Sequence, residues 1–137
     1  MPSDATIAEL GRDDCLRLLA DHDVGRLVVV EDHVPLVFPV NYVLDGDAVV
    51  IRTGTGTKLY GATRSLVSFE VDDLDRGRRA GWSVVITGVA QEITDVDRPD
   101  LVDRLRRVAI EPWAPGDKPA LVRLAAATVT GRRITRG

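Results

Sequence analysis

The residues with the clearest chemical potential lie at positions 52–59, which read Arg-Thr-Gly-Thr-Gly-Thr-Lys-Leu. A phosphate dianion is bound by backbone N–H groups, hydroxyl donors and a cation, and a helix that begins at such a loop adds its dipole. The glycines allow close approach of the backbone, the threonines supply hydroxyls, and Arg52 and Lys58 supply positive charge. The loop therefore predicts an anion site. A flexible turn between a strand and a helix has the same composition, so both interpretations stay open.

Other kinds of chemistry have no comparable signal in the sequence. The P-loop spacing is absent, and so is the strand–helix–strand context of a dinucleotide fingerprint. His22 and His33 fall in or near expected turns without a second His or Cys at ligand spacing, so no metal site is predicted. There is no Gly-x-Ser-x-Gly sequence, and Cys15 is expected to be a buried structural thiol. No catalytic residue is identified.

Length and charge restrict the class of protein. The chain has 137 residues, which suits one domain, and 45% of them are hydrophobic, so a core can form. A net charge of −3 without a basic stripe argues against a nucleic-acid partner. The apolar runs are too short to span a bilayer, and no signal-peptide pattern opens the chain. The single cysteine excludes an intrachain disulfide, and we expect a cytoplasmic protein.

Short apolar runs rich in β-branched residues, separated by turn residues, predict a mainly β chain. The expected strands cover 27–30, 34–43, 48–53, 66–71 and 81–94, followed by a final strand or pair over 120–126 and 128–134. The other expected segments are a flexible lead over 1–11, short helices from Asp13 or Asp14 to about Asp23, over 57–64 and over 98–109, and a proline-rich linker over 111–119. Tight turns predict an antiparallel sheet, and closure into a barrel removes exposed edges. The expected fold is therefore a six- to seven-stranded antiparallel β-barrel with a few short α-helices, in a single domain over 1–137.

Two of the expected strands lead directly into the threonine-rich loop. The first ends in Pro39-Val40-Asn41-Tyr42, and Asp45-Gly46 then forms a hairpin turn before the strand over 48–53. If these two strands pair, Asn41 faces the same groove as the loop. The hairpin and the loop are therefore expected to form one binding region.

A second region lies around the turn before the long strand. Residues 72–80 contain three acids followed by three arginines, and we interpret them as the solvated tip of a hairpin. Trp82 and Ser83 open the next strand. A tryptophan at this position is usually a core residue, although it could also stack on an aromatic ring or cover a subunit interface.

Six short segments are informative through their order and spacing. They are Val24-Gly25-Arg26-Leu27, Pro39-Val40-Asn41-Tyr42, Ile51-Arg52-Thr53, Gly56-Thr57-Lys58-Leu59, Val67-Ser68-Phe69-Glu70-Val71 and Gly81-Trp82-Ser83-Val84. With these segments, residues 12–135 resemble the pyridoxamine 5′-phosphate oxidase-like flavoproteins. The resemblance is strongest to the small actinobacterial members and their nitroimidazole-resistance relatives.

That resemblance implies a split β-barrel homodimer with two FMN sites at the dimer interface. By position in the motifs, Val40 and Asn41 would border the flavin ring. The implied phosphate site comprises Arg52, Thr53, Thr57, Lys58 and Leu59. Trp82 and Ser83 would be contributed at or across the interface. Members of the wider group use deazaflavin F420 or haem in place of FMN, so F420 and haem are the alternative cofactors.

The leading functional hypothesis is an FMN-dependent oxidoreductase that acts on a small molecule. In such an enzyme the flavin performs the hydride chemistry and the protein orients it. The C-terminal arginine and histidine motif of the vitamin B6 oxidases is not found, so oxidation of vitamin B6 is not expected. The alternatives are an F420-binding reductase, a non-enzymatic flavin- or haem-binding module, and a structural dimer whose site is vacant.

Overall fold

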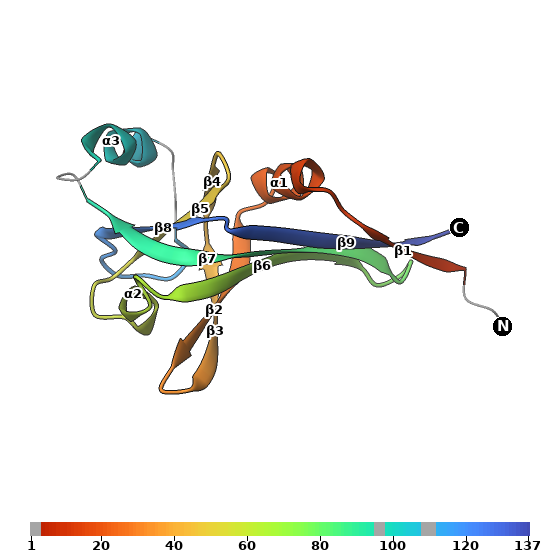
Figure 1. Cartoon of the computed structure of the whole chain (residues 1–137), viewed down its shortest axis with the longest axis horizontal. Helices are drawn as coiled ribbons and strands as arrows, with labels where there is room; N and C mark the ends of the chain where they lie inside the picture. The colour runs from red at the N-terminus through yellow and green to blue at the C-terminus, as the bar shows by residue number, and fades with distance from the viewer. Residues whose placement is uncertain (1–3, 95–97, 108–111) are drawn as a thin grey trace.

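The strand β7 (Ala80–Ile93) runs through the centre of a curled antiparallel sheet (Figure 1). The computed structural model describes residues 4–94, 98–107 and 112–137, and this part of the chain contains nine strands in one sheet. The other strands are β1 (Ala5–Glu9), β2 (Val24–Glu31), β3 (Val34–Asn41), β4 (Val43–Asp45), β5 (Ala48–Thr53), β6 (Leu66–Asp75), β8 (Ala120–Ala125) and β9 (Thr128–Arg136). The helices are α1 (Arg12–Ala20), α2 (Lys58–Gly61) and α3 (Pro99–Arg107).

The pairing of β7 produces a split barrel. One edge of β7 pairs with β6, whereas the other edge is divided: Gly81–Thr87 pair with β9 and Ala90–Ile93 pair with β8. From β8 the sheet continues through β5 to β4, and from β6 it continues through β2 to β3. Because only Tyr42 separates β3 from β4 in the chain, the two ends of the sheet meet there. The mainly β, antiparallel split-barrel fold confirms the predicted fold class.

Tyr42 is fixed at this junction by three contacts. Its backbone N–H donates to the carbonyl oxygen of Asp23 at 2.9 Å, and its hydroxyl donates to the carbonyl oxygen of Leu19 at 2.6 Å. Its ring meets the ring of Phe69 edge-on, with 4.9 Å between centroids. Burial raises the pKa of the Tyr42 hydroxyl, so it stays a donor. Tyr42 therefore joins α1, the loop before β2 and the barrel interior.

The break at Tyr42 changes the predicted hairpin. The strand expected over 34–43 is divided into β3, which pairs with β2, and β4, which pairs with β5. Asn41 lies opposite Val24 of β2, so the expected pairing of Asn41 with the strand over 48–53 is wrong. The physical reason is that Tyr42 turns into the core and interrupts the strand, as its buried side chain shows.

Alternating residues of the central strands fill the barrel. The inward-facing positions of β6 and β7 include Phe69, Val71, Val84 and Ile86, all nearly inaccessible to solvent. Helix α1 adds Cys15, whose thiol pKa is raised, chiefly by burial and then by nearby Asp14. The thiol is a structural core group, as predicted.

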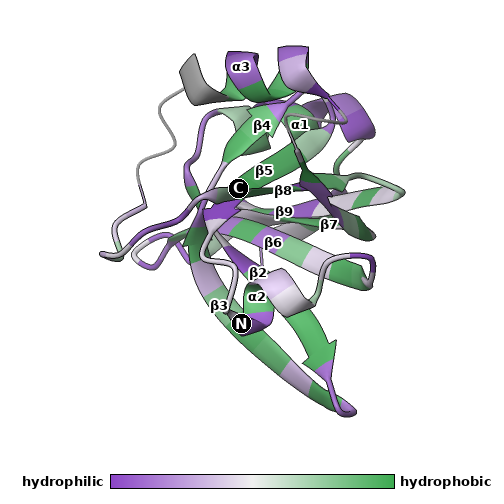
Figure 2. Cartoon of the chain, turned by 90° about the vertical axis from the view of Figure 1, so that its left-hand side faces the viewer, coloured by the Kyte–Doolittle hydropathy of each residue, from purple (hydrophilic) through white to green (hydrophobic). Residues whose placement is uncertain are grey.

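A second apolar layer covers only one part of the sheet, where α3 lies next to β4 and β5 (Figure 2). Its buried residues Leu101, Val102 and Leu105 belong to a cluster with residues of β5, β7 and β8, namely Val50, Ile93 and Leu121. Arg104 Nη2 donates to Asp45 Oδ1 at 2.7 Å and ties the helix to β4. Since β5 is covered on both sides, positions 48–51 are all buried instead of alternating.

The main difference from the predicted elements lies at the N-terminus. Ala5–Glu9 form β1, paired with β9 so that Ile7 lies opposite Ile134, and the expectation of a flexible lead is wrong for these residues. The strand over 48–53 and the break at 126–127 match the prediction. Positions 108–109 of the expected third helix lie outside the described residues. In the described part of the chain, no helix is long and apolar enough to cross a membrane.

Candidate functional site

The threonine-rich loop connects β5 to α2, and its hydroxyls hold its own shape. Thr57 is the N-cap of α2: its Oγ1 accepts from the Tyr60 N–H at 3.0 Å and donates to the Gly54 carbonyl oxygen at 2.9 Å. Thr53 Oγ1 lies 2.8 Å from Thr57 Oγ1. The hydroxyls expected to bind an anion are therefore engaged within the loop. Helix α2 has four residues, fewer than predicted, so its dipole is small.

The backbone of the same loop is open. No described residue accepts a hydrogen bond from the backbone N–H groups of residues 55–58. The side chain of Lys58 is 62% exposed, and its Nζ lies 3.9 Å from Glu31 Oε2, a loose surface pair that contributes little. A pocket of about 390 Å³ opens beside these groups, lined by parts of β2, the loop and α2: Val29, Val30, Glu31, Gly56, Thr57, Lys58, Gly61, Ala62 and Ser65. Gly56, Thr57 and Lys58 line this pocket, and their backbone N–H groups together with the Lys58 ammonium form an arrangement that can hold a dianion next to the Glu31 carboxylate.

The remaining residues of the predicted phosphate set do not line this pocket. Arg52 is exposed, and its Nε donates to the carbonyl oxygen of Lys118 at 3.3 Å. Thr53 is buried beneath the loop, and Leu59 packs in the core, where it anchors α2. Thr53 and Leu59 therefore support the loop from the core side, and Lys58 supplies the positively charged side chain in the pocket, opposite the Glu31 carboxylate.

The two residues predicted to border a flavin ring lie at the end of β3. Val40 is half-buried and packs against the core. Asn41 is half-buried as well, and its Oδ1 accepts from the backbone N–H of Trp113 at 2.9 Å. Neither residue lines the pocket beside Lys58.

Trp82 and Ser83 lie near the tip of the β6–β7 hairpin and, as successive residues of a strand, face opposite sides of the sheet. The Trp82 ring packs on the inner side and meets the His22 ring edge-on, with 4.8 Å between centroids. Trp82 pairs with Asp73, which lies about eight positions along the chain from Ser65 of the Lys58 pocket, a span of roughly 25 Å in a strand. Within one chain, Trp82 and Ser83 therefore cannot share a pocket with Lys58.

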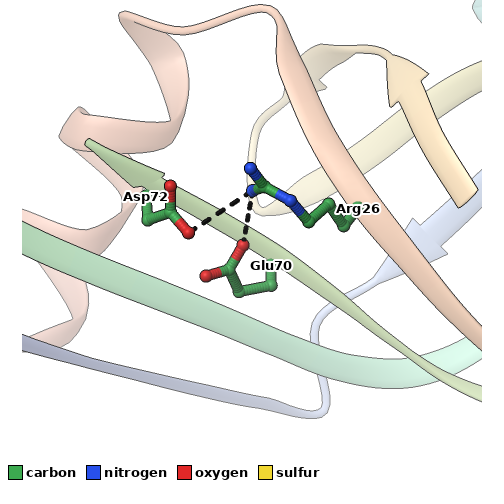
Figure 3. Close-up of polar contacts among 3 residues, drawn as sticks. All are labelled: Arg26, Glu70 and Asp72. Carbon is green, nitrogen blue, oxygen red and sulfur yellow. Dashed lines mark hydrogen bonds and ion pairs between the residues drawn. The ribbon is translucent and has the colours of Figure 1, made fainter. Parts of the chain in front are cut away.

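A charged cluster that the sequence analysis missed lies on the outer face of β2 and β6 (Figure 3). Arg26 Nη1 donates to Glu70 Oε1 at 3.0 Å and to Asp72 Oδ2 at 3.4 Å. Burial and then the neighbouring Asp72 raise the pKa of Glu70 to about 7, whereas Arg26 acts in the opposite direction. The alternation at 67–71 predicts that Glu70 faces away from the core, but only the pairing of β2 with β6 reveals its partner.

The contacts of His22 connect two parts of the fold. Among the described residues, no group of three or more His, Cys, Asp or Glu side chains could hold a metal ion. His22 Nδ1 lies 2.7 Å from the carbonyl oxygen of Leu18, and Nε2 lies 3.7 Å from Asp73 Oδ2. This histidine therefore joins α1 to β6.

Comparison with known proteins places the geometry in a family. A protein-family model described as pyridoxamine 5′-phosphate oxidase matches residues 11–133. An uncharacterized protein of Mycobacterium tuberculosis, Rv0080, is 40% identical over 134 residues, which cover 93% of this chain and 86% of that protein. The solved structure of a FAD-binding protein from Mycobacterium smegmatis has a TM-score of 0.71 and 30% identity, covering 93% of this chain and 98% of its own. A conserved protein of unknown function from Corynebacterium diphtheriae has a TM-score of 0.73 and 36% identity, covering 92% and 96% of the two chains. The split barrel and the family match over most of the chain establish that this protein belongs to the pyridoxamine 5′-phosphate oxidase family.

Proposed function

We propose that this protein is an FMN-binding oxidoreductase and that the phosphate of FMN binds at the loop over residues 55–58. The observation that carries the proposal is that Gly56, Thr57 and Lys58, whose backbone N–H groups have no described acceptor, line the 390 Å³ pocket together with the Lys58 ammonium. Phosphate oxygens are strong acceptors, and hydrogen bonds to a charged group are stronger than those between neutral groups. The FAD-binding relative from Mycobacterium smegmatis supports a flavin as the class of ligand.

The residues of this chain bind and orient the cofactor in the proposal. Lys58 and the loop backbone neutralise the phosphate, while Thr53 and Thr57 keep the loop in its binding shape. Val40 and Asn41 border the ring at the end of β3. When bound, the flavin supplies hydride transfer to or from a small-molecule substrate.

The proposed site uses two copies of the chain. Because roughly 25 Å of strand separates the Lys58 pocket from Trp82, we assign these two regions of one cofactor site to different copies of the chain. In a homodimer, the β6–β7 hairpin of the second copy brings its Trp82 and Ser83 to the first copy's loop. The proposed dimer therefore has two equivalent FMN sites at its interface.

The test is a titration of cofactor-free protein with FMN, followed by equilibrium dialysis and by flavin absorbance. Lys58→Gln should weaken FMN binding by roughly ten- to a hundredfold, as expected for loss of a hydrogen bond to a charged group. The matched control is Arg17→Gln, which removes one positive charge from the exposed surface of α1 and should bind FMN normally. Tight binding of F420 or haem without FMN binding would overturn the choice of cofactor. An unchanged affinity in Lys58→Gln would overturn the assignment of the phosphate site.

Oxidoreductase activity is tested separately from binding. We expect the FMN-loaded protein to be reduced by a nicotinamide donor and reoxidised by an added acceptor, with loss of turnover when the FMN is removed. Tight FMN binding with no reduction by any donor would favour a non-enzymatic flavin carrier.

A further inference from the structure

The segment between α3 and β8, residues 112–119, begins next to the ring end of the proposed site. The backbone N–H of Trp113 donates to Asn41 Oδ1 at 2.9 Å. This bond joins the segment to the end of β3, although 72 positions separate the two residues in the sequence. The 112–119 segment, which the sequence predicts to be a simple linker, is therefore attached to a residue expected to border the cofactor.

The other end of the 112–119 segment reaches the phosphate loop. The carbonyl oxygen of Lys118 accepts from Arg52 Nε at 3.3 Å. The carbonyl oxygen of Asp117 would lie 3.3 Å from a Cβ placed on Gly54, so a larger residue at Gly54 would press on the segment. The segment thus contacts both regions that the cofactor proposal requires, one near each end.

The composition of the segment limits its mobility. It contains Pro112, Pro115 and Pro119, whose fixed φ angles reduce the freedom of the backbone. Lys118 Nζ donates to the carbonyl oxygen of Pro115 at 3.2 Å, which closes a small internal loop. The backbone bond to Asn41 therefore holds Trp113 in a defined place.

The indole of Trp113 is nonetheless uncovered. Trp113 is 78% exposed, the highest exposed fraction among the exposed large hydrophobic residues of the described chain. No described residue makes a ring contact with it. Tryptophan is enriched at binding interfaces, because its ring combines a large apolar surface with a polar N–H group.

We propose that Trp113 is a further binding residue of the cofactor site, whose indole contacts the planar ring of the bound flavin, and that Asn41 positions it. This inference rests on the proposed function and extends it by assigning a ring-binding role to the 112–119 segment. Contact between two aromatic rings strengthens binding by about two- to tenfold beyond the effect of area burial. The contribution is specific for a flat ring, so Trp113 should discriminate FMN from a phosphate ligand without a ring.

The experiment measures FMN affinity and the fluorescence of the bound flavin in Trp113→Ala, Trp113→Phe and the unsubstituted protein. Trp113→Ala should raise the Kd for FMN by roughly three- to tenfold, whereas Trp113→Phe should change it by less than about threefold. Flavin bound to Trp113→Ala should fluoresce more strongly because contact with an indole quenches it. Competition by inorganic phosphate should be the same in all three proteins, because phosphate occupies only the loop. Val34→Ala, which trims another exposed apolar side chain, is the control.

The outcomes separate this inference from the proposed function. Failure of the unsubstituted protein to bind FMN would overturn both. Normal FMN binding with unchanged affinity and fluorescence in Trp113→Ala would overturn only the role of Trp113. A cofactor-free Trp113→Ala protein that loses its dimer would also overturn it, since the indole would then contact a second copy instead of the ring. Loss of FMN affinity with retained dimer and retained phosphate competition would support it.

Discussion

The outer face of the sheet is covered in one half and open in the other. Over β5 and β8, helix α3 covers the sheet with Leu101, Val102 and Leu105, each at most 5% exposed. Over β6, β7, β9 and β1, the described residues provide no such layer, and Ile7 and Leu74 remain 66% and 67% exposed. Two open pockets, of about 860 and 480 Å³, lie around the tip of the β6–β7 hairpin in this half.

The two halves of the outer face differ in what covers them: one is buried under α3, and the other is exposed. The residues under α3 are buried within one chain, so we expect the stability of this half to be independent of a second copy. The open half combines apolar residues with the Arg26–Glu70–Asp72 cluster, and exposed apolar surface of this kind is typical of an interaction site. We propose a second copy of the chain as its partner, because the cofactor site proposed above also uses two copies.

The largest expected effect comes from breaking the covered half. Leu105→Ala should reduce the free energy of unfolding by about 2–4 kcal/mol, because it leaves a cavity between α3 and the sheet. The loss should be the same at low and high protein concentration, and urea unfolding at two concentrations measures it. A loss that depends strongly on concentration would show that α3, too, is part of a subunit interface.

In the open half, we expect a substitution to change the free energy of unfolding less. We expect it instead to dissociate the proposed dimer. Val85 lies on the outer face between Glu70 and Thr130 of the neighbouring strands. Val85→Arg should place a long, charged side chain beside Glu70 in the proposed dimer interface and weaken association by about 1–3 kcal/mol, because the added atoms overpack a closely fitted surface. Sedimentation should then give the single-chain mass of 14.9 kDa with an unchanged circular dichroism spectrum. Val34→Arg, at the tip of the β2–β3 hairpin, is the control, and a Val85→Arg protein that remains dimeric would contradict the proposed interface.

The last effect concerns pH. The pKa of Glu70 is raised from 4.5 to about 7, so between these values the folded protein holds a proton that the unfolded chain has lost. Glu70 should therefore lower the free energy of unfolding as pH rises from about 4.5 to about 7. Above about pH 7 the free energy of unfolding should not change further because of Glu70. Glu70→Gln should remove this part of the pH dependence, as measured by thermal unfolding across the range. An unchanged pH profile in Glu70→Gln would assign the effect to other groups.

The sequence pattern predicted correctly those elements whose limits are set by residues nearby in the sequence. The strand over 48–53 has both of its predicted ends, because an apolar run begins after a glycine turn and ends at a glycine-rich loop. The strand β1 was missed because its partner β9 lies at the opposite end of the chain. The break at Tyr42 was missed for a similar reason, since the contacts that draw this side chain inward come from α1, the loop before β2, and β6.

The candidate site was predictable to a lesser extent. The glycine and threonine composition indicated an anion loop, and Lys58 lies in a pocket beside it. The sequence could not show that Thr53 and Thr57 bond to the loop itself, which leaves the backbone N–H groups as the open donors. Trp113 had no signal at all, because its bond to Asn41 depends on how α3 places the segment after it.

The central claim is that a flavin binds between two copies of this chain, and sedimentation velocity followed at the visible absorbance of FMN tests it most directly. We predict that bound flavin sediments with a species of twice the 14.9 kDa chain mass, at one FMN per chain, and that Val85→Arg releases it. Flavin that sediments with a single chain, or that stays entirely free at saturating protein, would contradict the account.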